Sequence, residues 1–278
     1  MLLRTDSQNQ SNLKTPISYY GGKQNLAKEL LKIIPNHIQY VEPFCGGATL
    51  FWIKQKSRHE VINDYESAVY NFWNVCKTDF EKLQHLVVNT MHSEEEYHTA
   101  RKIILSNNIS DKVLFAWAFW VTITISFSNK IDGGFAFSND SIQSKNTRKK
   151  RDNFNSYIYE RLKDTEIFNR DAIELILMKD TKDTFMYFDP PYAESDCGHY
   201  KNSKEVYYRL LEILPDLKCK WLMSSYPSEQ LDELRTSNNW NHKDIKKSVL
   251  VSVNNVGKMK TECLTWNYQT EGINISLF

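Results

Sequence analysis

The stretch Asp189-Pro190-Pro191-Tyr192 brings together a carboxylate, a carbonyl and an aromatic ring. The apolar run 184–188 just before it predicts a buried strand, which the prolines end because a proline nitrogen cannot donate to a sheet ladder. Two acceptors beside a ring that can stack suit a flat molecule with an exocyclic amino group. The alternative that this stretch alone leaves open is a strand-ending turn whose aspartate only caps a helix.

A second group of residues lies at a predicted strand-to-helix turn. The strand 38–41 leads into Glu42-Pro43-Phe44-Cys45-Gly46-Gly47, and a helix begins near Ala48. Glycines at such a turn let the backbone approach a ligand closely, although a plain tight turn would use them too. Asp64 ends the next predicted strand, where α/β nucleotide binders place the carboxylate that holds two ribose hydroxyls. The glycine turn, the carboxylate one strand later and Asp189-Pro190-Pro191-Tyr192 at a later strand end form a far more specific signal together than any one of them alone.

The rest of the chain predicts one α/β domain with an insertion. Strands and helices alternate before residue 66 and after residue 150, which favours a mostly parallel sheet covered on both faces. The last two strands are expected around 245–253 and 262–268, and they can be antiparallel. The helical stretch 66–150 interrupts this pattern as a separate lobe. The domain therefore comprises 15–65 and 151–278, and 1–14 is expected to be a flexible N-terminus.

Composition bounds the class of protein. The chain has 278 residues with 41% hydrophobic and 25% charged residues and a net charge of +1, which is typical of a globular protein without a global electrostatic field. Five scattered cysteines without a Cys-x-x-Cys spacing predict reduced thiols, with no disulfide framework and no zinc site. The start of the chain predicts no signal peptide. The uncharged run 113–127 is shorter than the roughly 20 residues of a membrane span and predicts a buried helix.

Taken together, the motifs resemble those of Dam-like (D12 class) DNA adenine-N6 methyltransferases, over most of the chain. Gly21-Gly22-Lys23 is similar to the family's N-terminal motif, the run Val41 to Gly47 to its glycine-containing cofactor motif, and Asp64 to its ribose-binding carboxylate. Asp171 stands where the family has an acid near the cofactor's adenine, and Asp189-Pro190-Pro191-Tyr192 matches its catalytic motif. The run 260–264 is similar to a closing motif on a late strand. Two features depart from the family pattern: the run 46–49 is not Gly-x-Gly, and alanine follows Asp171.

The resemblance implies a class I S-adenosylmethionine-dependent methyltransferase fold, with a Rossmann-like sheet and an inserted, mostly helical target-recognition lobe. It implies S-adenosyl-L-methionine as the cofactor, with these binding residues: Tyr19, Gly21, Gly22, Lys23, Glu42, Pro43, Phe44, Cys45, Gly46, Gly47, Asp64, Asp171 and Asp189. The lobe would contact DNA through these residues: Asn129, Lys130, Asp132, Phe135, Arg148, Lys149, Lys150 and Arg151. The basic residues suit phosphate contacts, and the tip 129–137 suits base contacts.

The implied activity is site-specific transfer of a methyl group to the N6 amine of adenine in double-stranded DNA. The base would leave the duplex and stack on Tyr192, and the Asp189 carboxylate and Pro190 carbonyl would accept its two amine protons. No metal, membrane or oligomer is required. The protein itself is expected in the cytoplasm, associated with the nucleoid, as a bacterial or phage product. Any cognate restriction endonuclease would act separately.

Other chemistries can be compared on the same residues. Cytosine-C5 methylation needs a nucleophilic cysteine that usually follows proline, and the chain has no Pro-Cys pair. RNA and protein-glutamine methyltransferases typically carry Asn in place of Asp189, and a nicotinamide oxidoreductase is disfavoured by the missing third glycine. Cytosine-N4 methylation uses the same geometry and stays open, as does a non-catalytic DNA-binding protein that keeps the fold.

Overall fold

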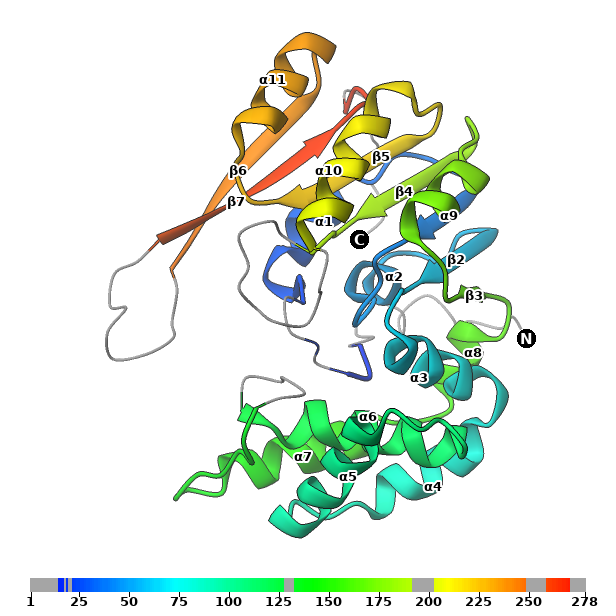
Figure 1. Ribbon diagram of the computed structural model, residues 1–278, viewed down its shortest axis with the longest axis vertical. Coiled ribbons are helices and arrows are strands. Elements are labelled where there is room, and N and C mark those ends of the chain that lie inside the picture. The colour runs from blue at the N-terminus through cyan, green and yellow to red at the C-terminus, as the bar shows by residue number, and fades with distance from the viewer. Residues whose placement is uncertain are drawn as a thin grey trace, which may run out of the picture. The chain divides into compact units, whose positions relative to one another are not determined.

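The structure is a computed structural model that describes residues 15–17, 19, 22–127, 133–191, 203–248 and 259–270 (Figure 1). The expected flexible N-terminus and the tip of the predicted hairpin, 128–132, lie outside these residues.

A seven-stranded mixed sheet has the order β3-β2-β1-β4-β5-β7-β6. Its strands are β1 (Gln39–Glu42), β2 (His59–Asn63), β3 (Glu166–Phe168), β4 (Thr184–Phe188), β5 (Lys220–Ser225), β6 (Asn241–Ser248) and β7 (Met259–Trp266). β4 is buried along its whole length and pairs in parallel with β1 on one side and β5 on the other, as the continuous apolar run predicts. The α/β class is confirmed, and β4 has the expected parallel pairings with β1 and β5, while β7 pairs antiparallel with both β5 and β6.

The antiparallel strands at the sheet edge differ from the expected boundaries. β6 and β7 pair from Asn241↔Trp266 to Ser248↔Met259, so both strands begin several residues earlier than their apolar residues suggested. The reason is that β6 is a charged edge strand, which is held by backbone pairing with β7 and needs little apolar surface. The two strands form the long ribbon at the sheet edge in Figure 1.

The chain divides into two compact units. The first comprises Met1–Lys28, Cys45–Lys56 and Ile62–Arg170, and the second Glu29–Phe44, Ser57–Val61 and Asp171–Phe278. The helices of the first unit are α2 (Thr49–Ile53), α3 (Ser67–Thr78), α4 (Phe80–Asn89), α5 (Glu94–Ser106), α6 (Lys112–Ile125), α7 (Ile142–Asp152) and α8 (Tyr157–Leu162), and a 3-10 turn spans Gln24–Leu26. The helices of the second are most of α1 (Ala27–Ile33), then α9 (Ala172–Lys179), α10 (Ser203–Ile213) and α11 (Glu229–Asn238), with a 3-10 turn at Leu214–Asp216.

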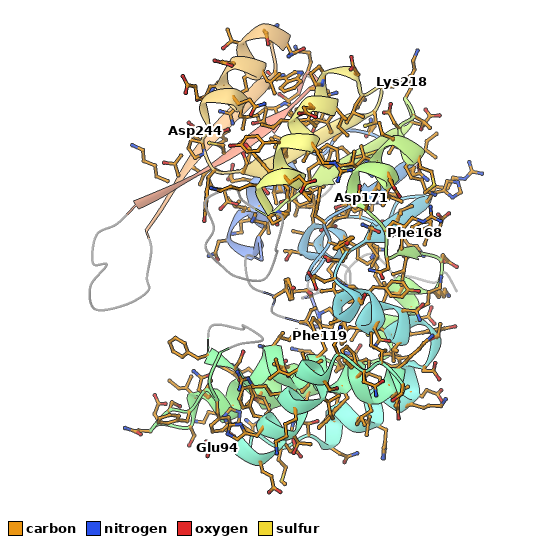
Figure 2. The ribbon with its side chains drawn as sticks, viewed as in Figure 1. Glu94, Phe119, Phe168, Asp171, Lys218 and Asp244 are labelled. Carbon is orange, nitrogen blue, oxygen red and sulfur yellow. The ribbon has the colours of Figure 1, made fainter. Side chains whose placement is uncertain are left out.

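Helix α6 is the core of the first unit. From Phe115 onward its side chains are buried with the exception of Trp117, which is half-buried, and it packs against α3, α4 and α5. Phe119, labelled in Figure 2, lies with its ring centroid 5.6 Å from that of Phe72 on α3. The expected buried helix is therefore present, but it ends at Ile125, and Phe127 at the end of the predicted run is exposed. In the part of the chain that the structure describes, no helix is long and apolar enough to cross a membrane.

Candidate active site

Asp189 follows the last residue of β4, at the carboxyl end of the parallel strands, where open α/β sheets bind ligands. The Ser224 hydroxyl, near the end of the neighbouring β5, donates a hydrogen bond to Asp189 Oδ1 across 3.0 Å. Ser224 is fully buried and Asp189 half-buried. The carboxylate is therefore held by a side chain from the next strand.

Tyr187 extends this contact into a chain of two hydrogen bonds. Its hydroxyl lies 3.0 Å from Ser224 Oγ, and since Ser224 uses its only proton on Asp189, Tyr187 must be the donor. Burial, and then the Asp189 charge, raise the pKa of Tyr187 well above its usual value, so the phenol stays protonated. Donors in series polarise one another, which strengthens the bond to the carboxylate.

Sequence reasoning missed Ser224 and Tyr187. Tyr187 stands two residues before Asp189, and alternate residues of a strand share a face. That spacing was a usable signal for Tyr187. Ser224 gave no local signal, because its role depends on the pairing of β4 with β5, which includes Phe188↔Met223.

Glu42 ends β1, the strand on the other side of β4. Its carboxylate is buried and accepts a hydrogen bond from the Tyr40 hydroxyl at 2.7 Å. Burial, followed by the charge of Glu42, raises the pKa of Tyr40 well above its usual value, so this donor also stays protonated. Because β1 and β4 are parallel, Glu42 and Asp189 both lie at the carboxyl ends of these neighbouring strands.

The glycine turn and Asp64 meet within the first unit. Gly46 adopts a positive φ of 44°, and its amide donates to Asp64 Oδ2 at 2.8 Å. The Glu66 amide donates to Asp64 Oδ1 at 3.0 Å. Burial raises the pKa of Asp64 to about 6, against the opposing effect of these two amides. The predicted turn and the predicted carboxylate therefore form one hydrogen-bonded group.

The N-terminal motif packs on this turn. A Cβ placed on Gly46 would lie 2.9 Å from Tyr19 Cδ1, and one on Gly47 would lie 3.0 Å from Tyr19 Cβ. A Cβ on Gly22 would lie 3.0 Å from the Tyr19 carbonyl oxygen. Trp73 Nε1 donates to the Gly46 carbonyl at 2.9 Å. The structure thus brings together Tyr19, Gly22 and the glycine turn. Lys23 and Cys45 are buried nearby in sequence.

Asp171 caps helix α9 (Figure 2). Its Oδ1 accepts from the amides of Ile173 and Glu174, and Arg209 forms a two-pronged ion pair with both carboxylate oxygens at 2.9 and 3.2 Å. Burial alone would raise the pKa of Asp171, but the Arg209 hydrogen bond and the two amides outweigh it, so the pKa lies below its usual value. Asp171 therefore has a structural use independent of any ligand.

The predicted DNA-contacting residues fall into three groups. Phe135 packs inward, with its ring centroid 5.1 Å from that of His92, whereas Phe137 is 76% exposed. Arg148 and Lys149 are exposed on α7, and burial lowers the pKa of Lys150 to about 8. The following predicted site residues lie outside the described residues: Gly21, Asn129, Lys130, Asp132 and Tyr192.

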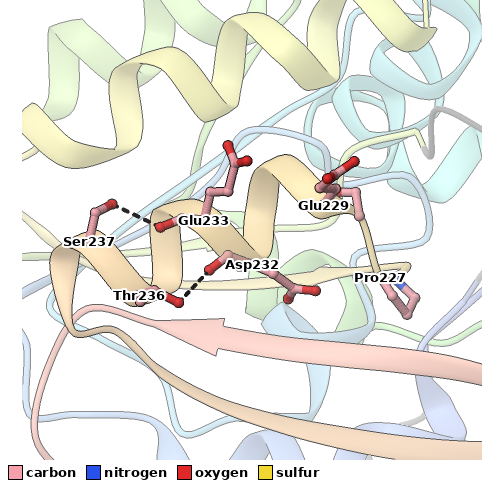
Figure 3. Close-up of a pocket in the computed structure, with 7 residues that line it drawn as sticks. Pro227, Glu229, Asp232, Glu233, Thr236 and Ser237 are labelled. Carbon is pink, nitrogen blue, oxygen red and sulfur yellow. Dashed lines mark hydrogen bonds between the residues drawn. The ribbon is translucent and has the colours of Figure 1, made fainter.

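Two other features bear on ligand chemistry. The open hollow along α11 carries the carboxylates of Glu229, Asp232 and Glu233 (Figure 3). An acidic surface of this kind repels phosphate and does not suit DNA. Among the described residues, no three His, Cys, Asp or Glu side chains group in a way that could hold a metal ion.

The chain is similar in sequence to known Type II methyltransferases. A Type II methyltransferase of Paramecium bursaria Chlorella virus NC1A, M.CviBI, is 24% identical over 231 residues, covering 80% of this chain and 86% of that protein. The Type II methyltransferase M1.LlaDCHI of Lactococcus lactis subsp. cremoris is 27% identical over 261 residues, covering 81% and 85%. A solved rRNA methylase from Streptococcus thermophilus covers 90% of this chain and 98% of its own, at 7% identity and a TM-score of 0.34, too low a score to support an argument.

The family match is broader than any single relative. The family model described as D12 class N6 adenine-specific DNA methyltransferase matches residues 19–255, which include the glycine turn, Asp64, the helical insertion and Asp189. The match confirms the expected family and activity, and it favours adenine over the cytosine-N4 alternative. The chain belongs to the D12 class of N6 adenine-specific DNA methyltransferases.

Proposed function

We propose that this methyltransferase uses S-adenosylmethionine to methylate N6 of an adenine in duplex DNA, and that Asp189 is its catalytic carboxylate. Membership of the adenine-specific DNA methyltransferase family supports adenine as the methylated base and DNA as the substrate. The observation that carries the catalytic assignment is the hydrogen bond by which buried Ser224 holds Asp189 at the carboxyl end of β4. A carboxylate fixed in this way can receive an amine without reorganising, which is how preorganised polar groups lower barriers.

The residues of the first unit fit the proposed cofactor. The absence of a side chain at Gly46 leaves the turn close to Tyr19. Asp64 already accepts two backbone amides, and a carboxylate has about four lone-pair sites, so it can accept two further hydrogen bonds from neighbouring hydroxyls. Besides Tyr19, Gly46 and Asp64, the proposed cofactor residues are Gly21, Gly22, Lys23, Glu42, Pro43, Phe44, Cys45, Gly47, Asp171 and Asp189. When bound, S-adenosylmethionine supplies an electrophilic methyl group on a sulfonium sulfur.

The chain's contribution to the reaction is to make the adenine amine nucleophilic. The N6 lone pair of adenine is delocalised into the ring. Hydrogen bonds from the two N6 protons to the Asp189 carboxylate and the Pro190 carbonyl would localise that lone pair and aim it. Asp189 is then the acceptor nearest to the proton that N6 must lose. The roles of Pro191, as the end of the turn, and of Tyr192, as the stacking partner of the extruded base, remain part of this proposal.

DNA recognition is proposed for the insertion 66–150, and catalysis for 15–65 with 151–278. The exposed cations Arg148 and Lys149 on α7 support phosphate contacts in the insertion. The relatives named as Type II methyltransferases support a role in protecting DNA from a restriction endonuclease that acts separately. We propose that the enzyme needs no second copy of itself for this reaction.

Replacement of the catalytic carboxylate tests the assignment. We expect Asp189→Ala to lose methyl transfer by about 100-fold or more, because the amine loses its charged acceptor, while DNA binding persists. Single-turnover methyl transfer, with anisotropy for DNA binding and calorimetry for the cofactor, separates these quantities. Activity near the wild-type rate in Asp189→Ala would remove the basis of the proposed mechanism.

A further inference from the structure

A small cavity lies beside helix α7 in the first unit. It has a volume of about 100 Å³ and is lined by His92, Ser144, Lys145, Thr147, Arg148 and Arg151. The five lining residues from α7 recur at helical spacing, so they share one face. A water molecule occupies roughly 30 Å³, so the cavity has room for a larger polar group. Its lining combines three cationic side chains with the Ser144 hydroxyl, which suits an oxyanion.

The cations of the cavity are not neutralised within the described part of the chain. No described carboxylate forms an ion pair with Lys145, Arg148 or Arg151. Burial raises the pKa of Glu96, and the charge of Arg151 opposes this only in part, while Glu96 accepts a hydrogen bond from the Met91 amide at 2.9 Å. The cavity therefore keeps an excess of positive charge.

Arg151 is held in place by a hydrogen bond, but another of its hydrogen-bond donors has no acceptor among the described residues. Its Nη1 donates to the Thr90 carbonyl at 2.6 Å, which fixes the guanidinium against the end of α4. Its Nε is buried and has no acceptor among the described residues. A held guanidinium with donors to spare is the arrangement by which arginine binds phosphate, because its planar fork matches two phosphate oxygens.

His92 connects the cavity to the segment predicted to contact DNA. Its Nε2 lies 2.9 Å from the Ala136 carbonyl, which can only accept, so Nε2 carries the proton. Its Nδ1 lies 2.8 Å from Thr147 Oγ1, so the Thr147 hydroxyl donates to it. Burial lowers the pKa of His92, so the ring is neutral and links Thr147 on α7 to Ala136 through hydrogen bonds. Tyr97 adds a second tie, since its hydroxyl donates to the Gly133 carbonyl.

We propose that this cavity binds one backbone phosphate of the DNA substrate, with Lys145, Arg148 and Arg151 as the cationic donors. The proposal rests on the proposed function and deepens it. Phosphate contacts fix the register of a protein on DNA. A phosphate held here would set the position of residues 133–137 on the DNA, because the hydrogen bond from His92 to the Ala136 carbonyl connects them to the same cavity.

The salt dependence of DNA binding by the full chain tests this proposal. Each phosphate contact contributes about −0.9 to the slope of log K against log salt concentration. We expect Arg148→Gln to make the slope shallower by about 1 and to weaken binding about tenfold at 0.1 M salt. Lys102→Gln removes the same charge from an exposed position on α5 of the same unit, outside the cavity, and should leave the slope as it is. Fluorescence anisotropy with a labelled duplex between 50 and 200 mM salt is the readout.

A neighbouring variant separates the cavity from a diffuse charged surface. Lys149 is a proposed phosphate contact on the exposed surface of the same helix but does not line the cavity, so its contact is more open to solvent and Lys149→Gln should change the slope less than Arg148→Gln does. Equal changes in the two variants, or no change in Arg148→Gln, would overturn the cavity assignment while leaving the methyltransferase proposal intact. Wild-type protein that neither binds nor methylates DNA would instead overturn the proposed function itself. Arg148 is exposed, and thermal unfolding verifies that the variants stay folded.

Discussion

Replacing Ser224 by alanine probes the support of the catalytic carboxylate. The change removes the hydroxyl that donates to Asp189 Oδ1 at 3.0 Å. A hydrogen bond to a charged group contributes roughly 1.5–3 kcal/mol. Since about 1.4 kcal/mol of lost transition-state stabilisation is a factor of ten in rate, we expect kcat to fall about 10- to 100-fold. The dissociation constants for cofactor and DNA should stay within about twofold, because Ser224 is fully buried and acts through Asp189.

Stability must be separated from catalysis in this test. Ser224→Ala also leaves the buried Tyr187 hydroxyl without its acceptor, at a cost of about 1–3 kcal/mol in the free energy of unfolding. The double variant Ser224→Ala/Tyr187→Phe removes that orphaned hydroxyl, so it should recover much of the stability but none of the lost rate. Single-turnover methyl transfer at saturating DNA and cofactor, together with denaturant unfolding, measures both. A wild-type rate in Ser224→Ala, or a rate that recovers along with stability in the double variant, would refute the positioning role.

Two further predictions concern the proposed cofactor residues. Because burial raises the pKa of Asp64 from 3.8 to about 6, its stabilising contribution to the unliganded fold is complete below pH 3.8 and is lost as the pH rises through 6. Hydroxyl donors of the cofactor favour the carboxylate instead, so cofactor affinity should fall as the pH drops below about 6; calorimetry that finds the same affinity at pH 5 and pH 8 would contradict this use of Asp64. Gly46→Ala places a Cβ 2.9 Å from Tyr19 Cδ1 at a positive φ, so we expect a loss of about 1–3 kcal/mol in unfolding free energy and weaker cofactor binding. An alanine variant of wild-type stability and affinity would show that the turn tolerates a side chain.

The sequence was most informative where chemistry and local structure coincide. The buried strand before Asp189, the glycine turn and the buried helix α6 were all predictable, because each depends on residue types that are adjacent along the chain. These features can be predicted because residues that are adjacent along the chain determine them.

What the sequence could not give depends on contacts between distant residues. Ser224 supports Asp189 only because β4 and β5 pair in one register. His92 joins Ala136 to Thr147, residues that are separated from it by 44 and 55 positions. The ends of β6 and β7 also depend on pairing rather than on apolar residues. No periodicity reports these relationships, because each is fixed by packing of the folded chain.

The central claim is the transfer of a methyl group to adenine N6 in DNA. Its most direct test is to incubate duplex DNA with the enzyme and S-adenosylmethionine that carries a labelled methyl group, then digest the DNA to nucleosides and separate them. The account predicts that the label appears in N6-methyladenine and disappears with Asp189→Ala. Label in N4-methylcytosine, or no labelled nucleoside despite measurable cofactor binding, would contradict it.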